Sequence, residues 1–386
     1  MKSKSIVLFF AMAFILLAFE VAHVYFIMPM PGGSQNINSI DVAYFLHSYR
    51  WLLRGILTLL FLYFACHSLA QHKIKTLSTA VAVFFISYTF NDFTAADTMF
   101  LQPQTLRFET NKKSSIAEDK IILGYHNGAV AKAYPIQLVG YHHQIRDTIN
   151  DTSILITYCT VCRTGRAYSP IIAGRAATFR LVGMDHYNAM FEDDSTKSWW
   201  RQATGEAIAG VRKGDKLLEI PLLQCTLKEW LGLYPNSLIM QPDTLFELAY
   251  GDMKNYENGL SIGSLTKYDT CSWERKSWIV GVNIDGLPRA YDWNELLKYH
   301  VIVDSFSTKK IIVTLANDNK SFAALLLPDS SATHTIRMHN DSVWVNAVAY
   351  HWSGKSLDST LADLPQIQAY QEYWHSWNTF QPTTTK

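Results

Sequence analysis

The stretch ILGYHNGAVAKAY, residues 122–134, recurs 157 residues later as IVGVNIDGLPRAY, residues 279–291. The similarity extends past this stretch in the same register and without a gap. Eight positions are identical in the two copies: Ile122/Ile279, Gly124/Gly281, Ala133/Ala290, Tyr134/Tyr291, His143/His300, Ile145/Ile302, Asp147/Asp304 and Thr157/Thr314. Self-similarity at a fixed offset is typical of a repeated structural unit. We therefore expect two similar lobes produced by an internal duplication.

Each copy has the pattern of a β-rich lobe. Its apolar segments are short, contain many β-branched or aromatic residues, and are bounded by Gly, Asn, Asp or Pro. Asn127-Gly128 and Asp285-Gly286 are dipeptides typical of β-hairpin turns. The expected strands are 120–123, 130–134, 153–158, 176–182, 277–284, 310–315, 321–327, 333–338 and 342–347. Helical pattern is confined to 227–233, 294–299 and a C-terminal segment, 361–377, so the predicted fold class of the soluble part is mainly β.

Three apolar runs precede the lobes, at about residues 6–28, 51–70 and 77–93. Each is close to the roughly 20 residues that a helix needs to cross a bilayer. The first run is longer than the apolar region of a cleaved signal peptide, roughly 7–15 residues, and no small-residue cleavage site follows it. The sequence therefore predicts three transmembrane helices.

The basic residues at the ends of these runs predict the orientation. Lys2 and Lys4 precede the first run, and Lys73 and Lys75 lie in the short loop between the second and third. Basic residues accumulate on the cytoplasmic side, so the chain after residue 93 is expected outside the cytoplasm. The predicted organisation is a membrane region over 1–93, a linker over 94–118, a first β-rich lobe over 119–272, and a second lobe with the C-terminal helix over 273–386.

The charge balance of the chain argues against one class of partner. The formal net charge is +1, and the soluble part has no basic stripe interleaved with aromatic residues. Nucleic-acid-binding domains usually carry such a positive footprint. The expected partners are therefore the membrane, in which the chain is integral, and a protein of the cell envelope, but not a nucleic acid.

Several motifs resemble those of a bacterial domain-of-unknown-function family, number 3179. The motifs, in order, are Lys132-Ala133-Tyr134-Pro135, His143-x-Ile145-x-Asp147, Thr157-Tyr158-Cys159-x-x-Cys162, Ser198-x-Trp200-x-Gln202-x-x-Gly205-x-Ala207-Ile208-x-Gly210 and Trp374-x-x-Trp377-x-x-Phe380-x-Pro382-x-Thr384. The resemblance covers about residues 121–384 and implies no established activity. A bacterial source places the expected spans in the inner (cytoplasmic) membrane, with the C-terminal domain in the periplasm.

One stretch distinguishes the two copies. The run ILITYCTVCRTG, residues 154–165, carries Cys159 and Cys162 at the end of an expected strand, whereas the second copy has Ala316 and Asn319 at those positions. A feature of the fold itself should tend to occur in both copies, as His143 and Asp147 do. We therefore interpret the cysteine pair as a site, and His143 primarily as a structural residue.

Three chemical interpretations of the cysteine pair remain open. Two close thiols in an oxidising compartment can cycle between dithiol and disulfide, with Arg163 and Arg166 favouring the thiolate. A thioredoxin-like site is not expected, because Ser169-Pro170 and Ala173-Gly174 interrupt the helix that would have to follow. Two buried thiols or a disulfide that only brace the strand end are the structural alternative.

A metal site is the third interpretation. Thiolates suit copper(I) or zinc, and His143, Met184 and His186 are candidate further ligands. A structural zinc would need four ligands, commonly a second C-x-x-C, so copper or an open site is the better match. The sequence thus predicts a membrane-anchored extracytoplasmic protein with a metal or redox site, or alternatively a non-catalytic envelope-binding module. It leaves open whether the chain is an enzyme.

Overall fold

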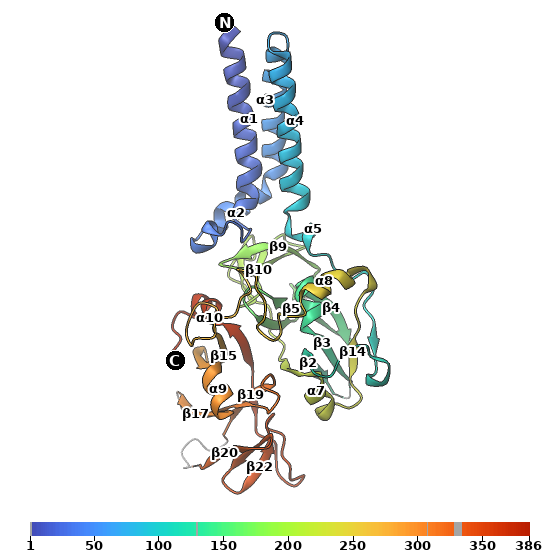
Figure 1. The fold of residues 1–386 in the computed structure, drawn as a ribbon, viewed down its shortest axis with the longest axis vertical. Helices are drawn as coiled ribbons and strands as arrows, with labels where there is room; N and C mark the ends of the chain where they lie inside the picture. The colour runs from blue at the N-terminus through green and yellow to red at the C-terminus, as the bar shows by residue number, and fades with distance from the viewer. Residues whose placement is uncertain (1, 129, 307, 328–333) are drawn as a thin grey trace. The chain divides into compact units, whose positions relative to one another are not determined.

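The computed structural model describes residues 2–128, 130–306, 308–327 and 334–386. A helical N-terminal region is followed by many small β-sheets (Figure 1). The chain divides into two compact units. The first contains residues 1–101, 177–201 and 206–216, and the second contains residues 102–176, 202–205 and 217–386.

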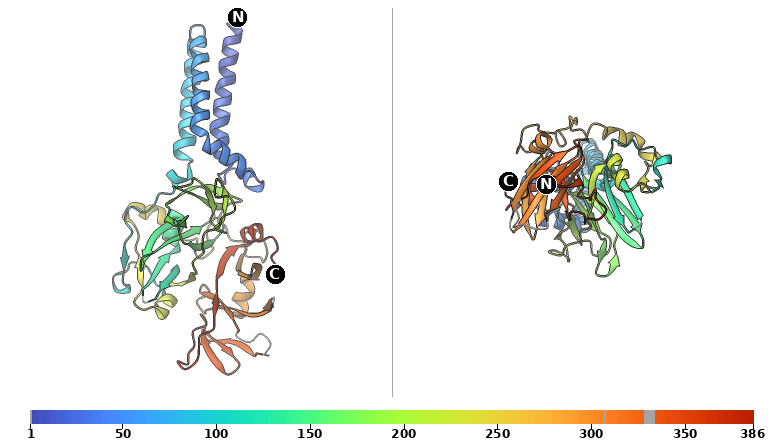
Figure 2. Two further views of the ribbon diagram at one scale, coloured as in Figure 1. Left: turned by 180° about the vertical axis from the view of Figure 1, so that it is seen from behind. Right: turned by 90° about the horizontal axis from the view of Figure 1, so that it is seen from below.

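The first unit contains the apolar helices. Its helical elements are α1 (Lys2–Tyr25), η1 (Gly33–Asn36), α2 (Ile40–Ser48), α3 (Arg50–Leu69), α4 (Lys73–Tyr88), the π-helical turn η2 (Thr89–Phe93) and α5 (Ala96–Met99). Helices α1, α3 and α4 pack side by side, as Figures 1 and 2 show. By length and composition, α1 from Ser5 and α3 are able to cross a membrane, whereas α4 has 16 residues.

A polar cluster joins the three packed helices near one end. Arg54 of α3 donates two hydrogen bonds to the Glu20 carboxylate of α1, at 2.7 and 2.8 Å. Asn91, which follows α4, donates to Glu20 at 2.9 Å and accepts from Arg54 at 2.6 Å. Charged groups in an apolar helix bundle are costly unless they are paired, and here each has a partner from another helix.

The first unit also contains one sheet of four strands. Their order is β12 (Ala207–Ala209), β11 (Trp199–Arg201), β10 (Asn188–Asp193) and β9 (Phe179–Asp185). Val182, Met190 and Trp199 of this sheet pack against Ile27 and Ala43 of the helical segment in one buried cluster. The sheet is therefore part of the core of the helical unit.

The second unit holds the remaining sheets. Before residue 177 and around 223–240 there are three sheets, each given in spatial order: β1 (Phe108–Glu109), β14 (Leu238–Met240), β3 (Val130–Pro135), β2 (Ile121–Asn127) and β13 (Leu223–Thr226); then β4 (Gln144–Ile149), β5 (Thr152–Cys159) and β6 (Thr164–Tyr168); then β7 (Ile171–Ile172) and β8 (Arg175–Ala176).

After residue 277 there are three more sheets. The first is β16 (Leu287–Asp292), β15 (Trp278–Ile284) and β24 (Ala369–Tyr373), and the second is β17 (Val301–Phe306), β18 (Lys309–Leu315), β19 (Phe322–Leu326) and β23 (Gln366–Ile367). The third is β20 (Ile336–His339), β21 (Ser342–Val345) and β22 (Val348–His351).

Short helices complete the second unit: η3 (Asn111–Lys113), α6 (Ile136–His142), α7 (Leu227–Leu233), η4 (Thr244–Phe246), α8 (Glu247–Asp252), α9 (Trp293–Tyr299) and α10 (Trp374–Phe380). The helices predicted at 227–233 and 294–299 are confirmed. The helix predicted over 361–377 is wrong in its first part, because 366–367 and 369–373 form β23 and β24. The start of the strand predicted at 333–338 lies outside the described residues.

The two repeated hairpins are present where the sequence predicts them. Asn127 pairs with Val130 in β2–β3, and Ile284 pairs with Leu287 in β15–β16. The Asp285-Gly286 turn has φ values of 54° and 83°, the positive region that such turns require. Asp285-Gly286 is thus the two-residue turn that the sequence predicts, whereas Asn127 still pairs within the first hairpin.

The repeated polar residues have repeated contacts. Asp147 accepts hydrogen bonds from Lys132 Nζ and Tyr134 Oη, both at 2.7 Å. Asp304 accepts from Arg289 Nε at 2.8 Å and from Tyr291 Oη at 3.2 Å. Each carboxylate therefore ties the strand after a short helix back to the hairpin before it, which is a structural role.

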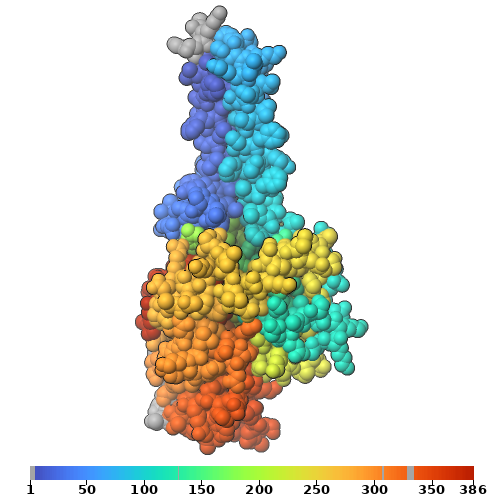
Figure 3. All heavy atoms as spheres, in the orientation of Figure 1, coloured from blue at the N-terminus to red at the C-terminus, as the bar shows by residue number. Residues whose placement is uncertain are grey.

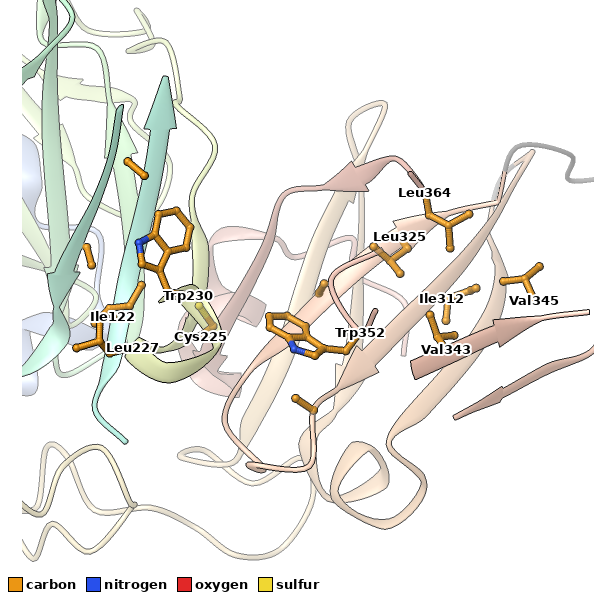
Figure 4. Close-up of a cluster of buried hydrophobic side chains, with 14 of the residues drawn as sticks. Ile122, Cys225, Leu227, Trp230, Ile312, Leu325, Val343, Val345, Trp352 and Leu364 are labelled. Carbon is orange, nitrogen blue, oxygen red and sulfur yellow. The ribbon is translucent and has the colours of Figure 1, made fainter. Parts of the chain in front are cut away.

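A glycine in each hairpin gives room for a tryptophan. A Cβ atom at Gly124 would lie 2.4 Å from the Trp230 ring of α7, and one at Gly281 would lie 2.4 Å from the Trp377 ring of α10. Figure 4 shows Trp230 beside Ile122, Leu227 and Cys225 in the first of these places. Real Cβ atoms do not approach rings so closely, so only glycine is compatible with this packing.

We predict that Gly124→Ala lowers the thermal unfolding temperature of the purified full chain. The added methyl group overpacks a fully buried ring, which typically costs about 1–3 kcal/mol. Gly232→Ala in α7 is the matched control, because nothing lies within 4 Å of its added Cβ. That control should be neutral or stabilising by about 0.5–1 kcal/mol. Equal unfolding temperatures for Gly124→Ala and the unmodified protein would contradict the packing argument.

Candidate functional site

Cys159 and Cys162 bracket a tight turn between two paired strands. Cys159 ends β5 and pairs with Thr164 at the start of β6. Both cysteine side chains are fully buried, and the structure holds them as thiols. The expectation of a strand end without a following helix is confirmed. The site is therefore a buried dithiol on a β-hairpin.

Three successive carbonyl groups of the turn are held by three separate segments of the chain. Tyr256 Oη donates to the Thr160 carbonyl at 2.8 Å, and Lys276 Nζ donates to the Val161 carbonyl at 2.6 Å. The backbone N–H of Tyr373, at the end of β24, donates to the Cys162 carbonyl at 2.8 Å. The turn is thus fixed by residues far from it in sequence, and two of the three lie in the expected second lobe.

Two side chains, those of Cys159 and His375, act electrostatically on the Cys162 thiol. Burial raises the pKa of Cys162 well above its usual value, and the interaction with Cys159 adds to the increase. The interaction with His375 acts in the opposite direction. At neutral pH the resting form of Cys162 is therefore the neutral thiol.

His375 is placed to accept a proton. Its Nδ1 lies 3.1 Å from the carbonyl oxygen of Arg275, which accepts only, so Nδ1 carries the ring proton and donates it. Burial lowers the pKa of His375, and the positive charges of Lys276 and Arg275 lower it further. The ring is then neutral at pH 7, and Nε2 is its basic nitrogen.

Lys276 supplies a buried positive charge beside the thiols. It is 8% exposed, and its Nζ lies 4.4 Å from the centre of the Tyr373 ring. Burial lowers the pKa of Lys276 to about 8, while interactions with Cys162 and Cys159 act to raise it. Lys276 therefore stabilises negative charge on either sulfur.

Arg163, directly after the second cysteine, is buried completely. Its guanidinium donates to the Gln371 side chain at 2.9 Å, to the Tyr256 carbonyl at 3.2 Å and to the Glu257 carbonyl at 2.9 Å. It also lies 3.7 Å from the centre of the Trp278 ring. These contacts join the cysteine hairpin to strands β24 and β15.

Arg166 makes a second buried connection from the same hairpin. It lies 3.3 Å from carboxylate oxygens of both Glu219 and Glu372, and its guanidinium lies 3.3 Å from the centre of the Tyr370 ring. Both arginines predicted to favour a thiolate are thus engaged with β24. Instead, Lys276 interacts electrostatically with both thiols and with His375, and Arg275 interacts with His375.

His143 occupies a structural position one strand away from the thiols. It caps α6 with φ 60°, and its Nδ1 donates to the carbonyl oxygen of Tyr158 at 3.0 Å. His300 repeats this arrangement, with φ 58° and a 3.0 Å hydrogen bond to the Leu315 carbonyl. Burial lowers the pKa of His143 to about 4. These contacts account for the presence of this histidine in both copies.

Met184 and His186 lie in the first compact unit, whereas Cys159, Cys162 and His143 lie in the second. The N–H of Met184 donates to the Ile27 carbonyl at 2.6 Å. His186 Nδ1 lies 2.5 Å from the Asp185 carboxylate. The contacts described for these two candidate ligands are therefore with their own unit.

The donor set of the described site suits a metal ion poorly. Among the residues that the structure describes, no group of three or more His, Cys, Asp or Glu side chains has the geometry of a metal site. The thiols also face Lys276, and a nearby positive charge opposes binding of a cation. The described residues thus give the predicted copper or zinc site no geometric support, and that site stays a prediction.

Sequence reasoning missed Lys276 and His375. His375 lies inside the Trp374-x-x-Trp377 motif, in which only the two tryptophans were considered. Lys276 lies in the charged run Glu274-Arg275-Lys276, which matches no motif. No local signal indicated these two residues, because only the pairing of the start of β15 with the end of β24 brings them together. Trp278 of β15 indeed pairs with Tyr373 of β24.

A separate cavity of about 660 Å³ lies in the second unit. Its lining combines aromatic and amide side chains from residues 124–234 and 322–369. They include Tyr125, Trp230, Tyr234, Phe322, Gln366 and Gln368. The cavity is bounded by β13 and β23, each the edge strand of its sheet. It is thus a candidate binding site that involves neither cysteine.

Comparison with protein families gives one match, to the model described as "Protein of unknown function (DUF3179)", over residues 102–384. Neither the curated proteins nor the solved structures yield a match. The matched region contains the dithiol, its lysine and its histidine.

We predict that Arg163→Lys strongly lowers the unfolding temperature of the full chain. Lysine keeps the charge but lacks the planar fork, so at least one of the three acceptors loses its donor, at a cost of about 1.5–3 kcal/mol for each bond to a charged group. Arg175→Lys, at an exposed position in β8, is the control and should change the temperature little. Equal changes in the unfolding temperature for Arg163→Lys and Arg175→Lys would refute the importance of the planar guanidinium at position 163.

Glu257 allows a pH test of the same region. Its side chain is 2% exposed, its Oε1 has no hydrogen-bond partner among the described residues, and burial raises its pKa above 4.5. Ionisation therefore costs stability as the pH rises from 4.5 through the folded-state pKa. We predict that Glu257→Gln raises the unfolding temperature at pH 7.5 and leaves it unchanged at pH 4, as thermal unfolding at both pH values will test. If Glu257→Gln changes the unfolding temperature by the same amount at pH 4 and at pH 7.5, this prediction is contradicted.

Proposed function

The chain belongs to the DUF3179 family, and we propose that it is a membrane-anchored extracytoplasmic protein whose Cys159 and Cys162 cycle between dithiol and disulfide. The observation that carries this proposal is the pair of fully buried thiols on one β-hairpin turn, whose Val161 carbonyl is held by the buried Lys276 ammonium; Cys159 and His375 also interact electrostatically with the Cys162 thiol. A thiol beside a neutral imidazole and a second thiol has what this reaction needs: a base for its proton and a resolving sulfur within reach.

The reaction is a thiol–disulfide exchange with a disulfide of a partner molecule. His375 takes the proton of Cys162, and the Cys162 thiolate attacks one sulfur of the partner, which breaks the partner's S–S bond and forms a mixed disulfide. Cys159 then loses its proton and attacks Cys162, which forms the Cys159–Cys162 bond and releases the second partner thiol. Two electrons and two protons pass to the partner, whose sulfurs are reduced.

The electrostatics of the site favour this reaction over metal binding. Lys276 and Arg275 place positive charge around Cys162 and His375, which stabilises a transient thiolate and disfavours a bound cation. His143, Met184 and His186 remain predictions as metal ligands, and copper or zinc remains a prediction as cofactor. The redox proposal needs none of them.

The cellular setting is part of the proposal. Helices α1 and α3 are apolar enough to span a membrane, and we take α4 with η2 as a third span, because the polar cluster of Glu20, Arg54 and Asn91 joins all three helices. The basic residues then place the DUF3179 region in the periplasm, an oxidising compartment in which disulfides persist. The repeated hairpins and their repeated Asp contacts support an internal duplication.

A second candidate function rests on the cavity between β13 and β23. Its aromatic and amide lining, drawn from both lobes, is the chemistry of a binding site. In this alternative the chain is an envelope-binding module, and the cysteines only brace the hairpin.

We predict reversible oxidation of the Cys159–Cys162 pair in the purified full chain. Titration with glutathione redox buffers, read by mass spectrometry after trapping with a thiol reagent, should give a loss of two mass units on the peptide that contains both cysteines. His375→Ala should slow the oxidation at neutral pH without moving the equilibrium midpoint, because the base affects the rate only.

Two controls separate the candidate functions. Cys159→Ser should abolish the two-unit change, whereas Tyr234→Ala in the cavity should leave it intact. Absence of reversible oxidation in the unmodified protein would remove the redox proposal. Loss of capture of an envelope partner in Tyr234→Ala, but not in Cys159→Ser, would favour the binding module.

A further inference from the structure

The segment Met253–Lys267 follows α8 and packs on the turn that carries both thiols. It contains no helix or strand, and all of its residues are described. Irregular segments of this length are uncommon in compact domains unless they serve a function. In Figure 3 the segment, drawn in gold, lies at the surface of the molecule.

Two side chains of the segment are buried; that of Tyr256 contacts the cysteine hairpin, and that of Glu257 accepts from the N–H of Ile121 in β2. Tyr256 and Glu257 are 3% and 2% exposed, whereas Leu260 and Ile262 are 64% and 95% exposed. Tyr256 Oη donates to the Thr160 carbonyl at 2.8 Å, and its ring lies edge-on to the Tyr158 ring. The segment is thus attached to the site mainly through one tyrosine and its neighbour.

Most other hydrogen bonds of the segment are internal. The N–H of Leu260 donates to the Asn255 carbonyl at 2.9 Å, and the N–H of Lys267 donates to the Gly263 carbonyl at 2.8 Å. Displacing the segment keeps these bonds and breaks those that attach it to the rest of the unit. These are the bond from Tyr256 Oη to the Thr160 carbonyl, those from Arg163 to the carbonyls of Tyr256 and Glu257, that from the Ile121 N–H to the Glu257 carboxylate, and that from Tyr373 Oη to the Thr266 carbonyl. The segment can therefore move as a unit, but its opening costs several hydrogen bonds, so the open form is a minor state.

We propose that Met253–Lys267 is a lid whose opening, with Tyr256 as its latch, admits the redox partner to Cys159 and Cys162. This inference rests on the proposed function. Both thiols are fully buried in the closed form, so a partner's disulfide can reach neither sulfur until a covering element moves. The lid then determines when exchange takes place, and the dithiol is protected from adventitious oxidants while it is closed.

The test measures how fast each cysteine of the reduced full chain reacts with N-ethylmaleimide under native conditions, followed by peptide mass spectrometry. Cys225 is the internal reference, because it is also fully buried but lies in β13, within a hydrophobic cluster (Figure 4). Lid opening exposes the pair alone, whereas global unfolding exposes all three thiols. We expect the Cys159–Cys162 peptide to react faster than Cys225.

Tyr256→Phe removes the latch hydrogen bond and keeps the ring. We expect it to increase the labelling rate of the pair about two- to tenfold, the effect of one hydrogen bond on the opening equilibrium, with no change at Cys225. Tyr134→Phe, which loses a hydroxyl contact to Asp147 in the same lobe, is the matched control and should leave both rates unchanged.

Two results would overturn the lid. One is equal labelling rates of the pair and Cys225 in the unmodified protein, since both would then react through unfolding. The other concerns the Tyr256→Phe variant. The lid is overturned if the labelling rate of the Cys159–Cys162 pair is the same as in the unmodified protein, or if it rises only together with the labelling rate of Cys225. Neither result bears on whether the thiols oxidise reversibly, so failure of the lid and failure of the redox function are distinguishable.

Discussion

The second unit depends on two buried arginines that leave the cysteine hairpin and engage β24. Arg163 reaches the side chain of Gln371, and Arg166 reaches that of Glu372. A buried guanidinium without acceptors is very costly, so the hairpin and β24 are stable only together. The dithiol therefore lies at a junction where segments far apart in the sequence meet, and residues of the cysteine hairpin, of 256–276 and of β24 surround it.

This junction explains which parts of the fold were predictable. The hairpins at 122–134 and 279–291 follow from short segments rich in β-branched and aromatic residues and bounded by turn residues, which are local signals. Strand β24 does not, because its aromatic and glutamine residues also suit a helix, and the stretch was assigned to one. Its strand conformation is imposed by pairing with β15 and by the hydrogen bond from Tyr373 to Cys162, and both are tertiary contacts.

The same distinction applies to the site. The sequence identified Cys159 and Cys162 because the positions 157 residues later hold alanine and asparagine, in a stretch that otherwise keeps eight identical residues in one register. Lys276 and His375 had no such contrast, and each is more than 100 positions away from the thiols along the chain. Single lysines and histidines are common, and only the folded contact makes these two informative. A repeat can therefore show where a site is, but not which residues complete it.

Burial and charge have different consequences at this site. Burial disfavours the thiolate but not the dithiol or the disulfide, because both of these are neutral. The charge of Lys276 and the basic nitrogen of His375 act only on the charged form that connects the two. The hydrophobic surroundings thus make both end states stable and the passage between them slow, while the lysine and histidine lower the barrier. Lys276 and His375 therefore control the rate of thiol–disulfide exchange, whereas the packing of the cysteine hairpin controls the equilibrium between dithiol and disulfide.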